Sequence, residues 1–207
     1  MFDLATSVEA SMGVVVGIGL AAACGFRVFV PMLGTSVASL SGYLDLAPEF
    51  DWIGTPVAAV CFGVAVVLEI AAYYIPWLDN LLDTIATPAA AIAGTIMTAS
   101  MVVEMSPFLK WSLALIAGGG VAGTIQSGTS LMRGLSSMTT AGSANPVFAT
   151  IEWISSLIMT ILAVVLPILA GMIAVALVIA AFIVFLKFWR IWRNRRTVTS
   201  AAGEPVR

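Results

Sequence analysis

Four charged residues need a partner if they lie at membrane depth: Arg27, Glu69, Arg133 and Glu152. A charge near the centre of a bilayer costs about 2.5–3.5 kcal/mol on the helix-insertion scale, so four unpaired charges would cost roughly 10–14 kcal/mol. Because that is comparable to the stability of a whole domain, we expect each arginine to contact a glutamate. Two interpretations stay open: ion pairs that fix the helix register, or the lining of a polar substrate path.

Two aspartates follow Glu69, Asp79 and Asp83, one helical turn apart. At this spacing they repel each other mildly unless a cation or an arginine lies between them. Together with Glu69 they offer the hard oxygen ligands that Mg²⁺ and Ca²⁺ prefer, which makes them candidates for cation binding. Their spacing matches no known metal loop, and a solvated helix face at the cytoplasmic boundary is the favoured explanation. We therefore predict no metal centre and no cofactor.

A polar stretch precedes the apolar residues 147–166, and it holds Thr140 and Asn145-Pro146. Helix termini at such a break bind anions, so Thr140 and Asn145 are candidates for an anion-binding helix break. The alternative is that these residues cap the next helix.

The residue types exclude most kinds of catalysis. The chain has no histidine, which removes the commonest general base and metal ligand. No HExxH and no Ser/His arrangement is present, so we expect no enzymatic activity. Cys24 and Cys61 lie in apolar segments and resemble small core residues, and a net charge of −2 does not suggest a nucleic-acid partner.

The composition indicates that most of the protein's surface faces lipid. Of 207 residues 60% are hydrophobic and only 10% charged, where soluble domains have about 25% charged residues. At about 20 residues per span, we predict an all-α polytopic membrane protein with about six transmembrane helices, and residues 1–207 form a single transmembrane domain. The expected crossings are residues 10–26, 57–75, 88–105, 108–126, 147–166 and 168–192, with a short interfacial helix at 77–86 ended by Pro88.

Two further segments are too polar or too short for ordinary crossings. Residues 28–43 are rich in Ser, Thr and Gly, which favours a re-entrant or half-helical segment over a thin crossing. Residues 128–145 are too polar to span. Gly13 and Gly17 form a GxxxG pair, which permits close helix approach and suggests homo-oligomers through glycine-rich faces, beside membrane lipids as partners.

The two halves of the chain resemble each other. Residues 13–27 align without a gap on residues 119–133, which matches Arg27 with Arg133. Residues 10–105 and 108–192 would then be two inverted repeats of three crossings each, an architecture of many secondary transporters. One feature disagrees, because Glu69 and Glu152 would both lie nearer the cytoplasmic side.

The basic residues of the segment KFWRIWRNRR, which runs into the tail 193–207, mark the cytoplasmic side of a membrane helix. Counting back from this tail puts the N-terminus in the cytoplasm as well, and we expect an inner-membrane protein. The segments LEIAAYYIPWLDNLLDTIATPAAAIAG (68–94) and TTAGSANPVFATIEW (139–153) resemble an uncharacterised family of small multi-pass membrane proteins, domain of unknown function 4126. The resemblance covers most of residues 10–175, leaves out the basic tail and implies no activity.

Inverted halves, broken segments and buried charges together predict a transporter or lipid-translocating protein with a central polar cavity lined by buried Glu and Arg. The alternative is a non-catalytic membrane scaffold or assembly protein whose buried charges are structural ion pairs.

Overall fold

The computed structural model describes the backbone of residues 4–103, 105–140 and 143–201, and their side chains except at 4–10, 76–77, 79–80, 191–192 and 194–201. Within these residues all regular secondary structure is helical, as predicted. The elements are α1 (Leu4–Cys24), α2 (Phe29–Leu40), η1 (Pro48–Gly54), α3 (Pro56–Tyr73), α4 (Pro76–Met101), α5 (Pro107–Leu113), η2 (Ala114–Gly119), α6 (Gly120–Thr140), α7 (Asn145–Val165) and α8 (Pro167–Ala201).

Five of the described helices are long and apolar enough to cross a membrane, over Pro56–Tyr73, Leu81–Met101, Pro107–Thr140, Asn145–Val165 and Pro167–Arg190. Two shorter apolar helices, Ser11–Cys24 and Phe29–Leu40, accompany them. Many side chains on the outside of the bundle are large and apolar. The chain is therefore an all-α multi-pass membrane protein.

Two prolines of α4 have different roles. Pro76 begins α4, where the missing N–H has no intrahelical partner to lose, but Pro88 lies inside this 26-residue helix. The expected break at Pro88 is therefore wrong, and residues 77–86 belong to a crossing helix. Membrane helices tolerate interior proline because neighbouring groups satisfy the freed backbone.

The polar segment after residue 126 also continues a helix. α5, η2 and α6 follow one another without a break, and η2 is a short π-helical stretch within the rod. Three polar residues of α6, Gln126, Arg133 and Ser136, are buried on its inner face. Burial against other helices, rather than exposure to lipid, explains why this sequence stays helical.

Glycines bring α1, α4 and η2 close together. A Cβ on Gly17 would lie 2.8 Å from the Cα of Thr98, and one on Gly94 would lie 2.7 Å from the carbonyl oxygen of Gly118. The hydroxyl of Thr98 donates to the carbonyl of Gly17 at 3.1 Å. The glycine face of α1 is thus used for packing inside the chain.

Helices α1 and α2 form a hairpin whose turn is inside the bundle. α1 runs to the turn at residues 25–28, most of which is buried or half-buried. α2 then follows α7, since Arg27 contacts Ala149 and a Cβ on Gly34 would meet Thr160. Non-helical backbone at membrane depth is tolerated where protein covers it, and this turn meets that condition.

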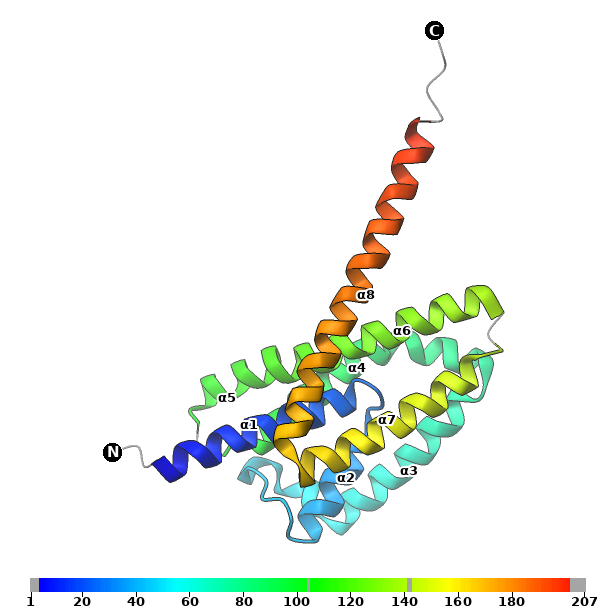
Figure 1. Cartoon of the computed structure of the whole chain (residues 1–207). Helices are drawn as coiled ribbons and strands as arrows, with labels where there is room; N and C mark the ends of the chain where they lie inside the picture. Colours follow the sequence, from blue (N-terminus) through cyan, green and yellow to red (C-terminus); the bar gives the residue numbers. More distant parts are fainter. Residues whose placement is uncertain (1–3, 104, 141–142, 202–207) are drawn as a thin grey trace.

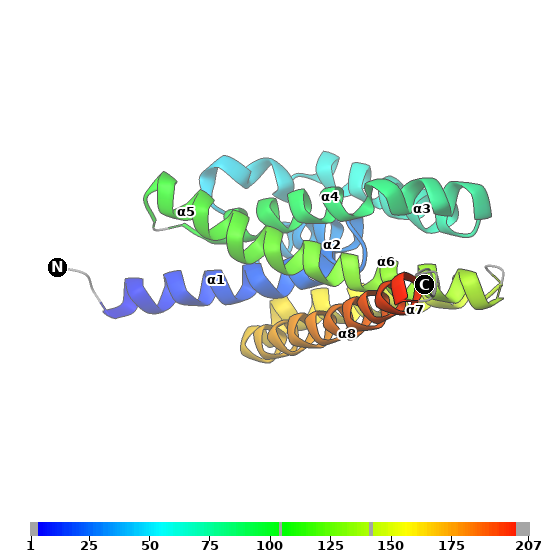
Figure 2. The same cartoon turned by 90° about the horizontal axis from the view of Figure 1, so that it is seen from above.

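The last helix diverges from the others. Figure 1 shows α8 crossing the bundle obliquely and projecting beyond it, while Figure 2 shows it along one side of the molecule. α1 begins at the left end of the bundle, and α8 projects out past its upper side (Figure 1). The α1–α2 hairpin returns to its starting end, and five candidate crossings follow it.

The directions of the helices also differ from a simple inversion of the halves. α1 and α6 run in the same direction. Arg27 follows the end of α1 and Arg133 lies near the end of α6, and both arginines bind the same glutamate. α3 and α7 run in opposite ways, since Glu69 is near the end of α3 and Glu152 near the start of α7. The extra α2–η1 segment in the first half adds one reversal of the chain.

Candidate functional site

A cluster of buried charges joins four segments of the chain. Arg27 Nη2 donates to Glu152 Oε2 at 2.8 Å, and Arg133 Nη1 donates to the same oxygen at 3.0 Å. Arg133 Nη2 also binds Asp83 Oδ1 at 2.6 Å. The side chains of the two arginines and Glu152 are 2%, 1% and 6% exposed. We call Arg27, Asp83, Arg133 and Glu152 the charge cluster.

Helix ends determine where the cluster lies. Arg27 lies in the α1–α2 turn. Asp83 and Glu152 lie about two turns after the start of α4 and α7, and Arg133 lies about two turns before the end of α6. Each arginine therefore contacts a glutamate, as predicted, but both contact the same one. Gathered in this way, the charges avoid most of the cost of separate burial in lipid.

An aromatic ring completes the cluster. Arg27 Cζ lies 3.6 Å and Arg133 Cζ lies 4.6 Å from the centre of the Tyr73 ring. Tyr73 is buried, and a cation over an aromatic face is stabilised by the ring quadrupole. The sequence signal for this role of Tyr73 is its position four residues after Glu69, on the same helix face.

Glu69 has a different role from Glu152. Its Oε1 accepts from the backbone N–H of Val28 at 3.0 Å, and its Oε2 accepts from that of Phe29 at 3.2 Å. These N–H groups belong to the start of α2, where a helix leaves donors without intrahelical partners and where its dipole favours an anion. Glu69 thus caps α2 from α3, and within the described residues it forms no ion pair.

The other predicted site residues lie in separate places. Asp83 binds Arg133, and the side chain of Asp79 lies outside the described part of the chain. A search of the described residues finds no group of three or more Cys, Asp or Glu arranged for a metal ion. Thr140 donates to the carbonyl of Ser136 at 2.9 Å, and Asn145 accepts from Ser137 at 3.2 Å, so both make local bonds away from the cluster.

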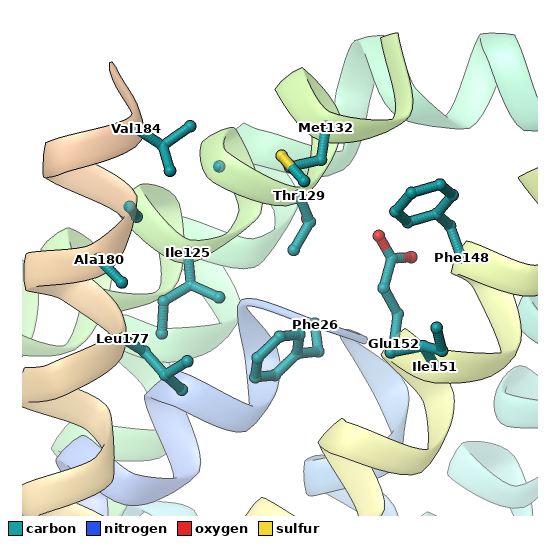
Figure 3. Close-up of a pocket in the computed structure, with 12 residues that line it drawn as sticks. Phe26, Ile125, Thr129, Met132, Phe148, Ile151, Glu152, Leu177, Ala180 and Val184 are labelled. Atoms are coloured by element: carbon teal, nitrogen blue, oxygen red, sulfur yellow. The ribbon is translucent and has the colours of Figure 1, made fainter. Parts of the chain in front are cut away.

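One pocket reaches the cluster from the side of α8. It has a volume of about 270 Å³ and is bounded by α6, α7, α8 and the ring of Phe26. Figure 3 shows Glu152 between Met132 and Phe148, with its carboxylate among apolar side chains. Both bonds of Glu152 to the arginines use Oε2, which leaves Oε1 without a hydrogen-bond partner in the described part of the chain. We call this the α8 pocket.

A second pocket lies on the other side of α7. It has a volume of about 240 Å³ and is lined by Arg27 with residues of α3 and α7, among them Tyr73, Tyr74 and Trp153. Nε and Nη1 of Arg27 and Nε1 of Trp153 are buried and have no hydrogen-bond acceptor among the described residues. Tyr74 and Thr150 bond to each other through their hydroxyls at 2.8 Å. We call this the α3 pocket.

The Arg27–Glu152 ion pair therefore lies between two pockets, the α8 pocket and the α3 pocket, whose walls differ in chemistry. Glu152 lines the α8 pocket and Arg27 lines the α3 pocket, while their side chains bind each other between them. The first pocket has a carboxylate among apolar groups, and the second has a guanidinium and aromatic side chains in its wall. The sequence predicts one central polar cavity lined by buried Glu and Arg; it does not predict two separate pockets, or that Phe148 and Trp153 line them.

The family model for a domain of unknown function, DUF4126, matches residues 14–187. Neither the curated proteins nor the solved structures include a match to this chain. The match covers most of the sequence, including every residue of the charge cluster and both pockets. The chain therefore belongs to the DUF4126 family, whose function is uncharacterised.

Proposed function

We propose that this protein moves an amphiphilic molecule across or within the membrane, as a transporter or lipid-translocating protein rather than an enzyme. The observation that carries the proposal is the Arg27–Glu152 ion pair, which has one member in the wall of each pocket. Opening this pair joins the two pockets into one path past α7. Intramembrane ionisable residues mark substrate paths in many membrane proteins.

The arrangement of the Arg27–Glu152 pair lowers the free-energy cost of opening it. Glu152 Oε2 is shared by both arginines, so when Arg27 moves away Arg133 still compensates the carboxylate. Arg27 keeps the ring of Tyr73 against its guanidinium. Neither charge is then left without a partner, a state that costs about 3–5 kcal/mol for a buried ion pair.

The α1–α2 hairpin supports the same proposal. Broken helices with capped ends near the membrane centre form substrate sites in secondary transporters, and here Arg27 and Phe26 at the turn contribute to the two pockets. We propose that this hairpin is re-entrant, and that the basic end of α8 faces the cytoplasm. In an inner membrane the start of α1 then faces the opposite side.

The alternative is a scaffold protein whose ion pairs are only structural. Its main support is that the three cluster charges Arg27, Arg133 and Glu152 are paired. Against it, the glycine faces expected to join copies of the chain at Gly13 and Gly17 pack on α4 of the same chain.

The proposal is tested by reconstitution into liposomes. Fluorescent amphiphiles with one or two chains are placed in both leaflets, and their accessibility to a membrane-impermeant quencher is followed with time. We expect exchange above that of protein-free liposomes, and a changed rate in Glu152→Gln. Glu49→Gln, at the far end of the bundle, is the control. No excess exchange for any amphiphile, with a folded protein, favours the scaffold.

A further inference from the structure

We infer that the α8 pocket binds the hydroxyl group of a single-chain lipid alcohol at Glu152. The inference rests on the proposed function, because it names the chemical class of the amphiphile that the path accepts. Three observations carry it: the hydrogen-bonding groups in the pocket wall, the balance of charge around Glu152, and the size and apolar character of the pocket.

Both polar groups in the wall are acceptors. Glu152 Oε1 has no partner in the described residues, since both arginines use Oε2. The hydroxyl of Thr129 donates its hydrogen to the carbonyl of Gln126 at 3.0 Å, which leaves its lone pairs to accept. A ligand in this pocket must therefore supply a hydrogen-bond donor, which excludes carboxylate and phosphate head groups.

The charge balance selects a neutral donor over a cation. Glu152 already binds Arg27 and Arg133 at 2.8 and 3.0 Å. An ammonium group at Oε1 would lie next to two guanidinium groups, and like charges in a region of low dielectric repel strongly. A hydroxyl group makes the hydrogen bond without adding charge, and a bond to a charged acceptor is stronger than one to a neutral acceptor.

The walls suit one hydrocarbon chain. Besides Glu152 and Thr129 the lining is made of Gly, Ala, Val, Leu, Ile, Met and Phe side chains, and Figure 3 shows Leu177, Ala180 and Val184 of α8 along one side. A volume of about 270 Å³ lies just below the range of about 300–1,000 Å³ for pockets that hold drug-sized ligands. This room fits one chain and not the two chains of a phospholipid.

The test uses three ten-carbon probes that differ only at one end: an alcohol, an amine and a plain hydrocarbon, each with a photoreactive diazirine in the chain. The full-length protein in lipid nanodiscs is cross-linked to each probe, and labelled peptides are quantified by mass spectrometry. We expect the alcohol to label the segments around Met132 and Leu177, and excess unlabelled decanol to suppress it. A hydrogen bond to a charged group predicts roughly tenfold more labelling than by the hydrocarbon.

Two variants separate binding in the pocket from contact with the surface. Ala180→Trp places a large ring at the wall of the pocket and should abolish the labelling, while Ile179→Trp, at a 55% exposed neighbour outside the lining, should leave it unchanged. Thr129→Val should reduce it without touching the charge cluster. Melting curves of each variant verify folding.

Several results would overturn the inference. Equal labelling by hydrocarbon and alcohol would mean an apolar groove without head-group recognition, and stronger labelling by the amine would mean a cation site. Unchanged labelling in folded Ala180→Trp would exclude the pocket. Because labelling needs no translocation, alcohol binding without lipid exchange refutes the proposed function alone, and exchange without alcohol binding refutes this inference alone.

Discussion

Arg27 and Glu152 lie 125 positions apart in the chain, yet Nη2 of the arginine donates to Oε2 of the glutamate at 2.8 Å in the interior. The contact ties the α1–α2 turn to α7. Because Arg133 shares the same oxygen, this one carboxylate holds three segments of the bundle together.

The two residues should show strong coupling in a double-mutant cycle. Arg27→Gln removes one partner of a buried pair, and a loss of about 3–5 kcal/mol in unfolding free energy is expected. Glu152→Gln should cost more, because it removes the partner of two arginines. The double variant should lose less than the sum of the singles. Denaturant unfolding in detergent measures all four proteins; strictly additive losses would mean that the pair contributes little.

Tyr73 should act through its ring and not its hydroxyl. Tyr73→Phe keeps the aromatic face over Arg27 and Arg133, so its stability should stay close to that of the parent. Tyr73→Leu removes the cation–π contacts and should lose about 1–4 kcal/mol for the two contacts together. Thermal unfolding of both variants checks this, and an equal loss in the two would assign the effect to the hydroxyl.

Glu69 should stabilise α2 rather than bind a substrate. Glu69→Gln keeps one acceptor for the N–H groups of Val28 and Phe29 and should cost about 1 kcal/mol. Glu69→Leu leaves both donors buried without an acceptor, at about 1–3 kcal/mol each. Hydrogen exchange at the start of α2, measured by mass spectrometry, should rise in the same order. A folded Glu69→Leu with unchanged exchange would contradict the capping role.

Close helix packing predicts opposite outcomes at two glycines. Gly94→Ala places a methyl group 2.7 Å from the carbonyl oxygen of Gly118, and the forced separation of α4 from η2 should cost about 1–3 kcal/mol. Gly120→Ala meets nothing within 4 Å and should be neutral or slightly stabilising. Melting temperatures in detergent compare the two, and an equal effect would refute the packing argument.

Glu49, at the end of the bundle away from the charge cluster, should make the stability of the protein depend on pH. Hydrogen bonds from a backbone N–H of its own residue and from Lys110 hold the pKa of Glu49 below its usual value. A lowered pKa in the folded state means that Glu49 stabilises the protein above its unfolded pKa of about 4.3, and that this contribution is lost as the pH falls through the folded pKa. The melting-temperature gap between wild type and Glu49→Gln should therefore narrow as the pH falls below the unfolded pKa, and close once the folded protein is protonated at Glu49. A gap independent of pH would contradict the assignment.

The sequence predicts the membrane class, the helical fold and the meeting of buried charges, because lipid penalises each of these residues by a known and large amount. It does not predict which partner each charge finds. Glu69 and Glu152 occupy similar apolar surroundings in the sequence, but only the added reversal at α2 decides that Glu69 reaches backbone N–H groups instead of an arginine.

Other features depend on the path of single helices. The α8 pocket exists because α8 crosses α6 and α7 obliquely (Figure 1), and a uniformly apolar helix gives no periodic signal for such an angle. Pro88 was read as a break because proline usually ends helices in water, whereas packing inside the bundle keeps α4 continuous.

The capping of α2 by α3 has a consequence for biosynthesis. When the α1–α2 turn enters the membrane, the first N–H groups of α2 have no Glu69 to accept from them until α3 has been translated. Arg27 likewise has no Glu152 to bind until α7 has been translated. The first hairpin therefore cannot settle at its final depth on its own. We expect it to stay near the insertion machinery until α7 emerges, so that the earliest part of the chain to be made is among the last to be fixed in place.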